Sequence, residues 1–250
     1  MLQETYHSSK KNLSQPSFTK KKRRKMTLRD FKSLFTVSAL YSGLCLLLFF
    51  TAKRQLINYG YLFLKGKVNL LSGEEGKVAS YCVSSLHGLL IVPSAMLYLT
   101  DRISLSTWRK LIGISIGYFF IDTVLFPLYM TNVRDFVQFG IHHLILLFVI
   151  VAYFNARPKL IAQGLLSEMT LPFLYACKFL IKIEKTDIML YKFVAVMTIL
   201  TWVFSRVISF AHIYYQLYKK GAPYMEYAIF APVVLMNYYW FFILLQKALC

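Results

Sequence analysis

The amino-acid sequence predicts an all-α polytopic membrane protein, a helical bundle or half-barrel of about seven spans. Its 250 residues are 57% hydrophobic but only 16% charged, against roughly 25% charged residues in an average soluble domain. The apolar residues also fall into runs of about 20 residues, the length of helix that crosses a bilayer. Composition and run length together exclude an ordinary soluble domain.

Seven segments of the chain have the length and composition of a span. We expect spans near 32–52, 79–99, 111–130, 138–154, 160–181, 190–217 and 224–245. The fourth is short, the fifth is interrupted by polar residues, and the sixth is long enough to tilt or to project from the membrane. Six spans, with the fifth segment re-entrant, is the alternative count. Between the first two spans, aromatic and apolar residues stand beside lysines, which suits a segment at the membrane interface.

Six consecutive basic residues, from Lys20 to Lys25, precede the first span. Such a run is attracted to the anionic lipid headgroups of the cytoplasmic leaflet and orients the span that follows. We therefore expect a disordered basic cytoplasmic tail at residues 1–28 and a membrane domain at 29–250, with the C-terminus on the opposite side. No folded basic domain accompanies the run, so the net charge of +18 does not indicate nucleic-acid binding. A cleavable signal peptide is not expected, because the first 25 residues are polar.

The four cysteines do not form a recognisable motif. Cys45, Cys82 and Cys177 lie inside apolar segments, and Cys250 is the last residue. There is no CxxC pair, so neither a disulfide framework nor a metal site is expected.

Ionisable residues inside the spans are the strongest indication of function. An Asp or Arg at mid-membrane costs roughly 2.5–3.5 kcal/mol on insertion scales, so such residues usually face a cavity or one another. In chain order, the ionisable residues of the predicted spans are His87, Asp122, His142, His143, Glu168, Arg206 and His212, and the last span adds the polar Asn237.

A polar stripe is predicted along the sixth span. Arg206, Ser209 and His212 step by three residues and so share one sector of a helix. An unpaired Arg at this depth would be costly, and we expect Glu168 or Asp122 to hold Arg206.

Two further spans present polar faces. In the fifth span, Gln163, Ser167 and Thr170 share a stripe. In the fourth span, His142 and His143 point about 100° apart. Polar faces on three helices predict a bundle that encloses a wet or headgroup-filled cavity.

Proline and glycine add two expectations about packing. Pro172 cannot donate a backbone hydrogen bond, so it frees the carbonyl of Glu168 at membrane depth. Gly113 and Gly117 form a GxxxG pair that lets another helix approach closely, most simply one of the same chain.

Four segments carry a family resemblance: GYFFIDTVLF (117–126), FGIHHLILLF (139–148), LLSEMTLPFL (165–174) and FSRVISFAHIYY (204–215). With them the chain resembles the TLC family, the membrane domain shared by ceramide synthases, translocating-chain-associating proteins and small lipid-homeostasis proteins. The resemblance covers about residues 79–245, and the chain looks most like the small TLC domain-containing proteins. It implies a multi-pass protein of the endoplasmic reticulum that handles lipid or acyl chains in a helical half-barrel.

The resemblance also suggests roles for particular residues. In ceramide synthases the His pair is associated with transfer of an acyl group from acyl-CoA to a sphingoid amine, and His142 and His143 occupy that pair. Ceramide synthases carry two aspartates ahead of the matching proline, where this chain has Glu168 and Leu171. One acidic group is retained and the other is lost.

The leading hypothesis is a membrane protein of lipid metabolism or homeostasis that binds or processes an acyl-chain lipid in an intramembrane polar cavity. The expected partner is membrane lipid, with no metal and no cofactor beyond acyl-CoA as the co-substrate of a transfer reaction. The alternatives are an acyl-CoA-dependent N-acyltransferase and a small-molecule transporter or receptor. Candidate catalytic residues are His142, His143, Asp122 and Glu168, and candidate substrate-binding residues are Arg206, Ser209, His212 and Asn237.

Overall fold

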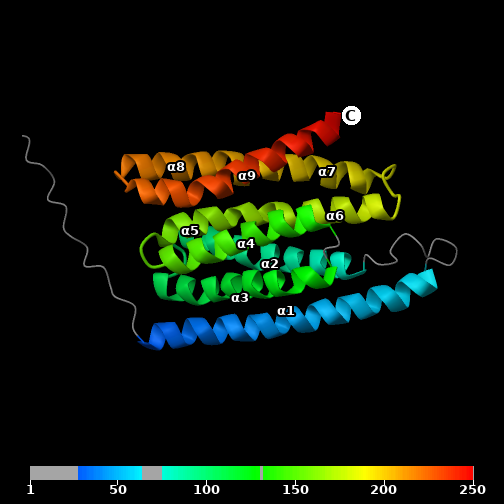
Figure 1. The fold of residues 1–250 in the computed structure, drawn as a ribbon, viewed down its shortest axis with the longest axis horizontal. Helices are drawn as coiled ribbons and strands as arrows, with labels where there is room; N and C mark the ends of the chain where they lie inside the picture. Colours follow the sequence, from blue (N-terminus) through cyan, green and yellow to red (C-terminus); the bar gives the residue numbers. More distant parts are fainter. Residues whose placement is uncertain (1–27, 64–74, 130–131, 250) are drawn as a thin grey trace, which may run out of the picture.

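The computed structural model describes residues 28–63, 75–129 and 132–249. The predicted basic tail, apart from Leu28, and residues 64–74 of the predicted interfacial connection lie outside them. Every regular element of the described residues is a helix (Figure 1). Six helices are long and apolar enough to cross a membrane. The predicted all-α polytopic membrane bundle is confirmed.

The helices form continuous rods joined by short connections. α5, η2 and α6 make one rod, and α7, η3 and α8 make another, so the described residues build seven rods in all. In chain order the elements are α1 (Leu28–Phe63), α2 (Glu75–Leu99), α3 (Leu105–Tyr129), α4 (Val133–Tyr153), α5 (Pro158–Leu165), the 3₁₀ helix η2 (Leu166–Thr170), α6 (Leu171–Lys182), α7 (Met189–Trp202), the π-helix η3 (Val203–Ile208), α8 (Ser209–Lys219) and α9 (Tyr224–Leu249).

The length and path of the fifth rod, formed by α5, η2 and α6, distinguish a membrane crossing from a re-entrant segment. Pro158–Lys182 is one of the six membrane-length helices, and Figure 1 shows it running from one end of the bundle to the other. This favours a crossing over a re-entrant segment. The remaining rod, α3, is 25 residues long and packs against α1 and α2. α1 continues to Phe63, so the first part of the predicted connection is helical.

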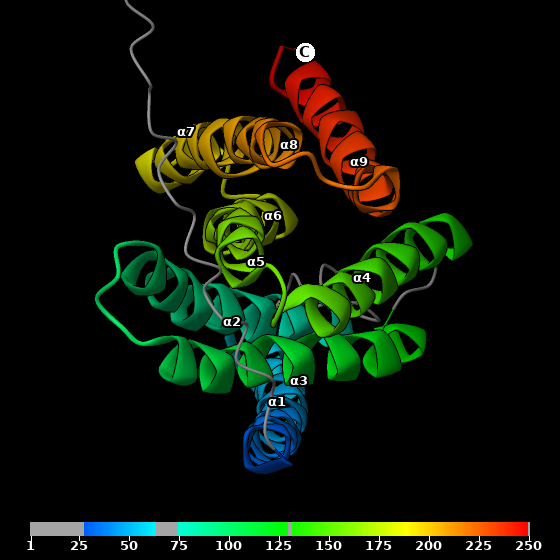
Figure 2. The ribbon, with the colours of Figure 1, turned by 90° about the vertical axis from the view of Figure 1, so that its left-hand side faces the viewer.

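Figure 2 shows the bundle from one end. The α5–α6 rod lies at the centre, with α2 on one side and the α7–α8 rod on the other. α4 and α9 contact each other beside it, and α1 lies outermost, against α3. The central rod is therefore the one that carries side chains toward most of the others.

α1 packs on α3 at the GxxxG pair, Gly113 and Gly117. A Cβ at Gly113 would stand 3.1 Å from the carbonyl oxygen of Leu34, and one at Gly117 would collide with the carbonyl of Ser38. Ser42 Oγ donates a hydrogen bond to the carbonyl of Gly117 at 3.1 Å. Such close backbone approach is possible only without side chains, so the pair serves packing within the chain.

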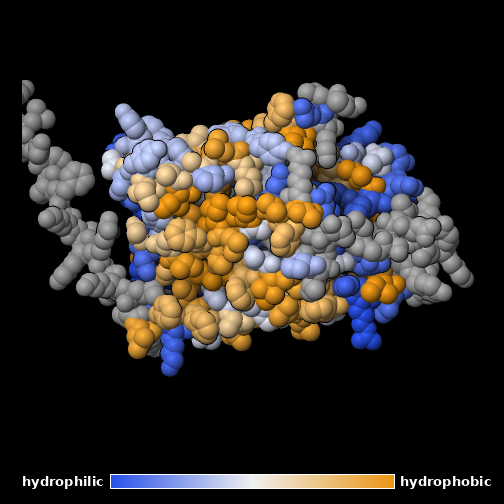
Figure 3. Space-filling model, viewed as in Figure 1, coloured by the Kyte–Doolittle hydropathy of each residue, from blue (hydrophilic) through white to orange (hydrophobic). Residues whose placement is uncertain are grey.

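The outer surface is apolar near the middle of the bundle's long axis. Figure 3 shows an apolar band across the middle of one face, with hydrophilic residues gathered toward the two ends. Several large apolar side chains are more than half exposed, as lipid-facing residues would be: Phe35, Leu47, Phe120, Phe148, Phe193 and Leu235. On a soluble protein such a surface would be an aggregation hazard.

Candidate functional site

Buried polar residues lie at half height in the bundle. His87 is the middle residue of α2 and His143 is the middle residue of α4, and their side chains are buried. Asp122 of α3, Glu168 of η2 and Arg206 of η3 lie near the middle of their own rods and are also buried. An unpaired polar side chain at this depth is energetically costly, so the partner of each one indicates the chemistry that the site allows.

His143 is paired with an acid. Its Nδ1 lies 3.1 Å from Oδ2 of Asp122. Tyr118 donates a hydrogen bond to Ser84 Oγ at 2.9 Å, and its hydroxyl lies 3.5 Å from the same Asp122 oxygen. The two atoms are close but not aligned as a hydrogen bond, so the contact is electrostatic, and a carboxylate beside Nδ1 favours a proton on that nitrogen.

A second histidine–carboxylate pair lies between α2 and η2. Nε2 of His87 is 3.8 Å from Oε2 of Glu168, and the His87 ring stacks on Tyr118 with centroids 4.0 Å apart. Neither ring nitrogen of His87 has a hydrogen-bond partner among the described residues. His87 is fully buried, and leaving polar atoms unsatisfied in such a place is costly.

His87 and Tyr118 were not among the site residues predicted from the sequence. His87 was noted only as an ionisable residue of its span. The signal that singles them out is spacing, because Ser84 and His87 share one helix face, as do Tyr118 and Asp122. The two polar faces meet where α2 packs on α3.

Proline and glycine together position Glu168. Pro172 has no N–H for the carbonyl of Glu168, and the N–H of Leu171 donates to that carbonyl instead, in the tighter 3₁₀ turn. A Cβ at Gly88 would stand only 2.7 Å from the same oxygen. α2 therefore approaches η2 closely, and the freed carbonyl lies against helix backbone rather than in an open cavity.

Arg206 is held by neutral side chains. Its Nε donates to Thr170 Oγ1 at 3.0 Å, and its Nη1 donates to Asn237 Oδ1 at 2.7 Å. The Asn237 amide in turn donates to the carbonyl of Val233 at 2.7 Å. The guanidinium also lies over the Trp202 ring, 4.7 Å from its centroid, a cation–π contact.

The acidic partner predicted for Arg206 is found only in part, because Glu168 attracts the charge of Arg206 without a direct contact. None of the ion pairs found among the described residues joins Arg206 to Glu168 or to Asp122. The physical reason is direction, since the carboxylate of Glu168 meets His87 and that of Asp122 meets His143.

Ser209 and Gln163 link α8 to α5. Ser209 Oγ donates to the carbonyl of Gln163 at 3.2 Å, and the Gln163 amide donates to the carbonyl of Ser209 at 3.2 Å. Gln163, Ser167 and Thr170 are all buried, so the polar stripe predicted on the fifth span faces the interior. Ser209 acts here as an interhelical contact.

The structure contradicts the prediction that His212 faces the site, because its side chain is exposed. Its Nε2 lies 3.0 Å from the Gln216 amide nitrogen, one turn along the same helix. The covered face of α8 is formed by Ser209, Phe210, Ile213 and Leu217. At about 100° per residue, His212 stands about 115° from the centre of that face, so the stripe ends at Ser209.

The two neighbouring histidines of α4 have different neighbours, although their rings remain close, with centroids 5.6 Å apart. His142 packs edge-on against Trp240 of α9, with ring centroids 5.1 Å apart. Its Nδ1 is buried and has no hydrogen-bond partner among the described residues. Only His143 meets an acid, so the two residues are not equivalent.

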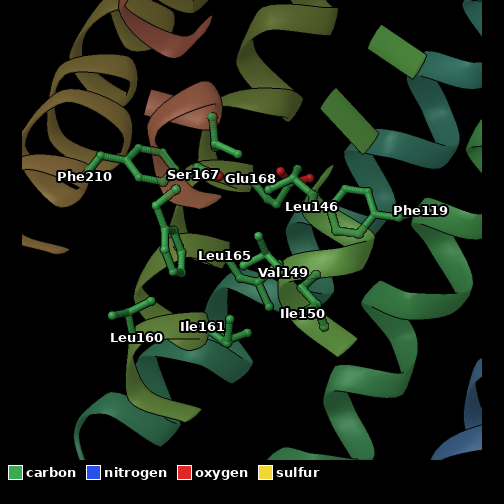
Figure 4. Close-up of a pocket in the computed structure, with 13 residues that line it drawn as sticks. Phe119, Leu146, Val149, Ile150, Leu160, Ile161, Leu165, Ser167, Glu168 and Phe210 are labelled. Carbon is green, nitrogen blue, oxygen red and sulfur yellow. The ribbon is translucent and has the colours of Figure 1, made fainter. Parts of the chain in front are cut away.

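An apolar pocket adjoins the histidines (Figure 4). It encloses about 30 Å³, or about 410 Å³ when all the space between its side chains and at its open side is included. Of the residues predicted for the site, Glu168 alone lines it, together with Ser167 and apolar side chains of α4, α5, α8 and α9. The Phe119 ring forms another part of the wall and lies 5.2 Å from the His143 ring and 5.6 Å from the His87 ring.

The cavity predicted for the site is thus only partly as expected. Glu168 faces it, whereas His143 and Asp122 lie behind Phe119 and Arg206 lies outside its lining. Among the described residues, no group of three or more His, Cys, Asp or Glu side chains has the geometry to hold a metal ion. What the arrangement offers is an apolar space ending at a carboxyl group, with two histidine–carboxylate pairs beside it.

Comparison with known proteins agrees with this arrangement. The TLC domain family matches residues 77–246, which include every residue of the two histidine–carboxylate pairs. Comparison with the curated proteins and with the solved structures gives no match. The family match covers more than half of the chain, so the protein belongs to the TLC domain family.

Proposed function

We propose that this protein binds an acyl-chain lipid within the membrane, with the chain in the apolar pocket and the polar end at Glu168. The observation that carries the proposal is the pocket itself, whose wall is apolar except at Ser167 and Glu168. Apolar lining with a few polar groups at one place is the usual design of a ligand pocket. Membership of the TLC domain family supports a role in lipid homeostasis and an endoplasmic-reticulum location.

The polar end of the ligand has defined neighbours. Glu168 lies 3.8 Å from His87, whose ring nitrogens have no hydrogen-bond partner in the described residues. A hydroxyl, amide or amine of a lipid would hydrogen-bond to the carboxyl group of Glu168, which lines the pocket.

Filling the pocket tests the proposal. A Cβ at Gly164 meets nothing within 4 Å, and this residue lines the pocket, so Gly164→Leu adds its side chain at the pocket from an open position. Gly43 has the same open surroundings but lies exposed on α1, so Gly43→Leu is a matched control. Both variants and the wild type are purified in nanodiscs and labelled with a photoreactive octanoyl lipid.

We expect several-fold less labelling of Gly164→Leu than of Gly43→Leu, because the added side chain takes the place of the acyl chain. Thermal unfolding of each variant shows that both are folded. Equal labelling of the two folded variants, or no labelling of the wild type, would overturn the proposal.

Acyl transfer to an amine is a second candidate, favoured by the contact between His143 and Asp122. In this reaction the amine nitrogen attacks the thioester carbonyl of acyl-CoA, and Nε2 of His143 accepts the proton from the amine. The coenzyme A thiolate leaves and takes a proton, so the products are an amide and coenzyme A. Asp122 stabilises the protonated imidazole, as carboxylates do beside catalytic histidines.

Labelled acyl-CoA and long-chain amines test this reaction with purified protein. His143→Ala removes the base and should abolish amide formation. Asp122→Asn removes the charge that stabilises the protonated imidazole and should lower amide formation. His142→Ala is the control, because His142 packs on Trp240 rather than on an acid. Undiminished amide formation in His143→Ala, or none by the wild type, excludes the reaction.

A further inference from the structure

The pocket is elongated along α5. Leu160, Ile161, Gly164, Leu165 and Glu168 all line it and occupy one sector of the helical rod. The eight steps from Leu160 to Glu168 correspond to about 12 Å of helix. Figure 4 shows Leu160 and Ile161 at one end of the pocket, with Ser167 and Glu168 at the other. A chain held by its polar end at Glu168 would therefore point toward Leu160.

The end of the pocket at Leu160 is closed. Leu160 is 5% exposed, and Phe230 of α9, which also lines the pocket, is 4% exposed. Behind Phe230, the Tyr153 ring packs against it with centroids 5.9 Å apart. Leu160 and Phe230 therefore form the floor of the pocket.

An ion pair between Arg157 and Glu226 stabilises the position of this floor. About one helical turn before Leu160 stands Arg157, and about one turn before Phe230 stands Glu226. Arg157 Nε and Nη2 each donate to one carboxylate oxygen of Glu226, both at 3.2 Å. A two-point contact of this kind fixes orientation, so it holds α9 against the start of α5.

The pocket opens at its side rather than at its floor. All of its lining residues are buried except Leu146 of α4 and Gly164 of α5, which are half-buried. A chain could enter past these two residues and still end against the floor.

We propose that Leu160 and Phe230 determine the longest acyl chain that the pocket accepts. This inference rests on the proposed lipid binding and adds a specificity determinant to it. Each methylene that fits gains burial, whereas the first one that does not fit must displace close-packed side chains. Binding should strengthen with chain length up to a limit and fall beyond it.

Competition measures that limit. Saturated single-chain lipids from butyryl to palmitoyl compete with the photoreactive octanoyl lipid for the wild type and for Leu160→Ala in nanodiscs. The substitution removes three side-chain carbons, so we expect the best competitor to become longer by about two to three carbons. Phe230→Leu should lengthen it as well, and serves in place of Leu160→Ala if that variant does not fold.

The matched control is Leu180→Ala. Leu180 is as well buried as Leu160, at 7% exposure, but lies on α6 away from the pocket. It should lower stability while the best competitor keeps its wild-type length. If a folded floor variant is labelled and still prefers the wild-type length, the floor inference is overturned while lipid binding stands. If the wild type is not labelled at all, the proposed function itself has failed.

Discussion

Arg206 illustrates how a charge is accommodated at the middle of the bundle. It is 4% exposed, and its hydrogen bonds go to the neutral oxygens of Thr170 and Asn237. A guanidinium has five N–H donors and does not lose its proton in proteins, so it depends on acceptors of any kind. Asn237 is itself fixed by the Val233 carbonyl, which makes it a well-placed acceptor.

This contact predicts a stability effect. Asn237→Leu leaves a buried guanidinium N–H unsatisfied and should lower the free energy of unfolding by about 1–3 kcal/mol. Adding Arg206→Met removes both partners, so the double variant should be less destabilised than the sum of the two single variants. Thermal unfolding of the four proteins in the same detergent measures the cycle. Strict additivity would show that the contact has no energetic significance.

At the scale of elements, two irregular turns face each other across the site. The 3₁₀ turn of η2 and the π-turn of η3 both interrupt otherwise α-helical rods, and the two elements are in contact. Pro172 accounts for the first. The second contains neither proline nor glycine, and turns of this kind are frequent at functional sites.

The close approach of α2 to η2 makes a second prediction. Gly88→Ala would place a Cβ 2.7 Å from the carbonyl oxygen of Glu168, so the two helices must separate. We expect destabilisation by about 1–3 kcal/mol. Gly164→Ala is the control, because its Cβ meets nothing within 4 Å and alanine favours the helix by about 0.5–1 kcal/mol. Apparent melting temperatures that fall equally in both variants would contradict this account.

The elements were largely predictable, whereas the partners of the site residues were not. Apolar run length predicted the rods, and helical spacing predicted that Gln163, Ser167 and Thr170 share a buried face. Spacing within one helix says nothing about which neighbouring helix a side chain meets. For that reason Arg206 contacts Thr170 and Asn237 directly and Glu168 only at longer range, and the buried position expected for His212 was wrong.

At the scale of the whole molecule, the order of the rods bears on topology. Consecutive rods run in opposite directions, and Figure 1 shows α1 beginning at the end of the bundle opposite to the one where α9 ends. An odd number of crossings would place the two termini on opposite sides of the membrane. The basic run from Lys20 to Lys25 favours the cytoplasm for the N-terminus.

Terminal tags on sealed endoplasmic-reticulum microsomes test this topology. Protease added outside should remove a tag at the N-terminus and spare one at the C-terminus until detergent opens the vesicles. The reason is the attraction of the basic tail to the cytoplasmic leaflet, combined with the predicted count of seven crossings, one for each rod. A lumenal resident protein that stays protected shows that the vesicles are sealed. Removal of both tags from sealed vesicles would mean an even number of crossings, and one of the seven rods would then have to lie outside the membrane core.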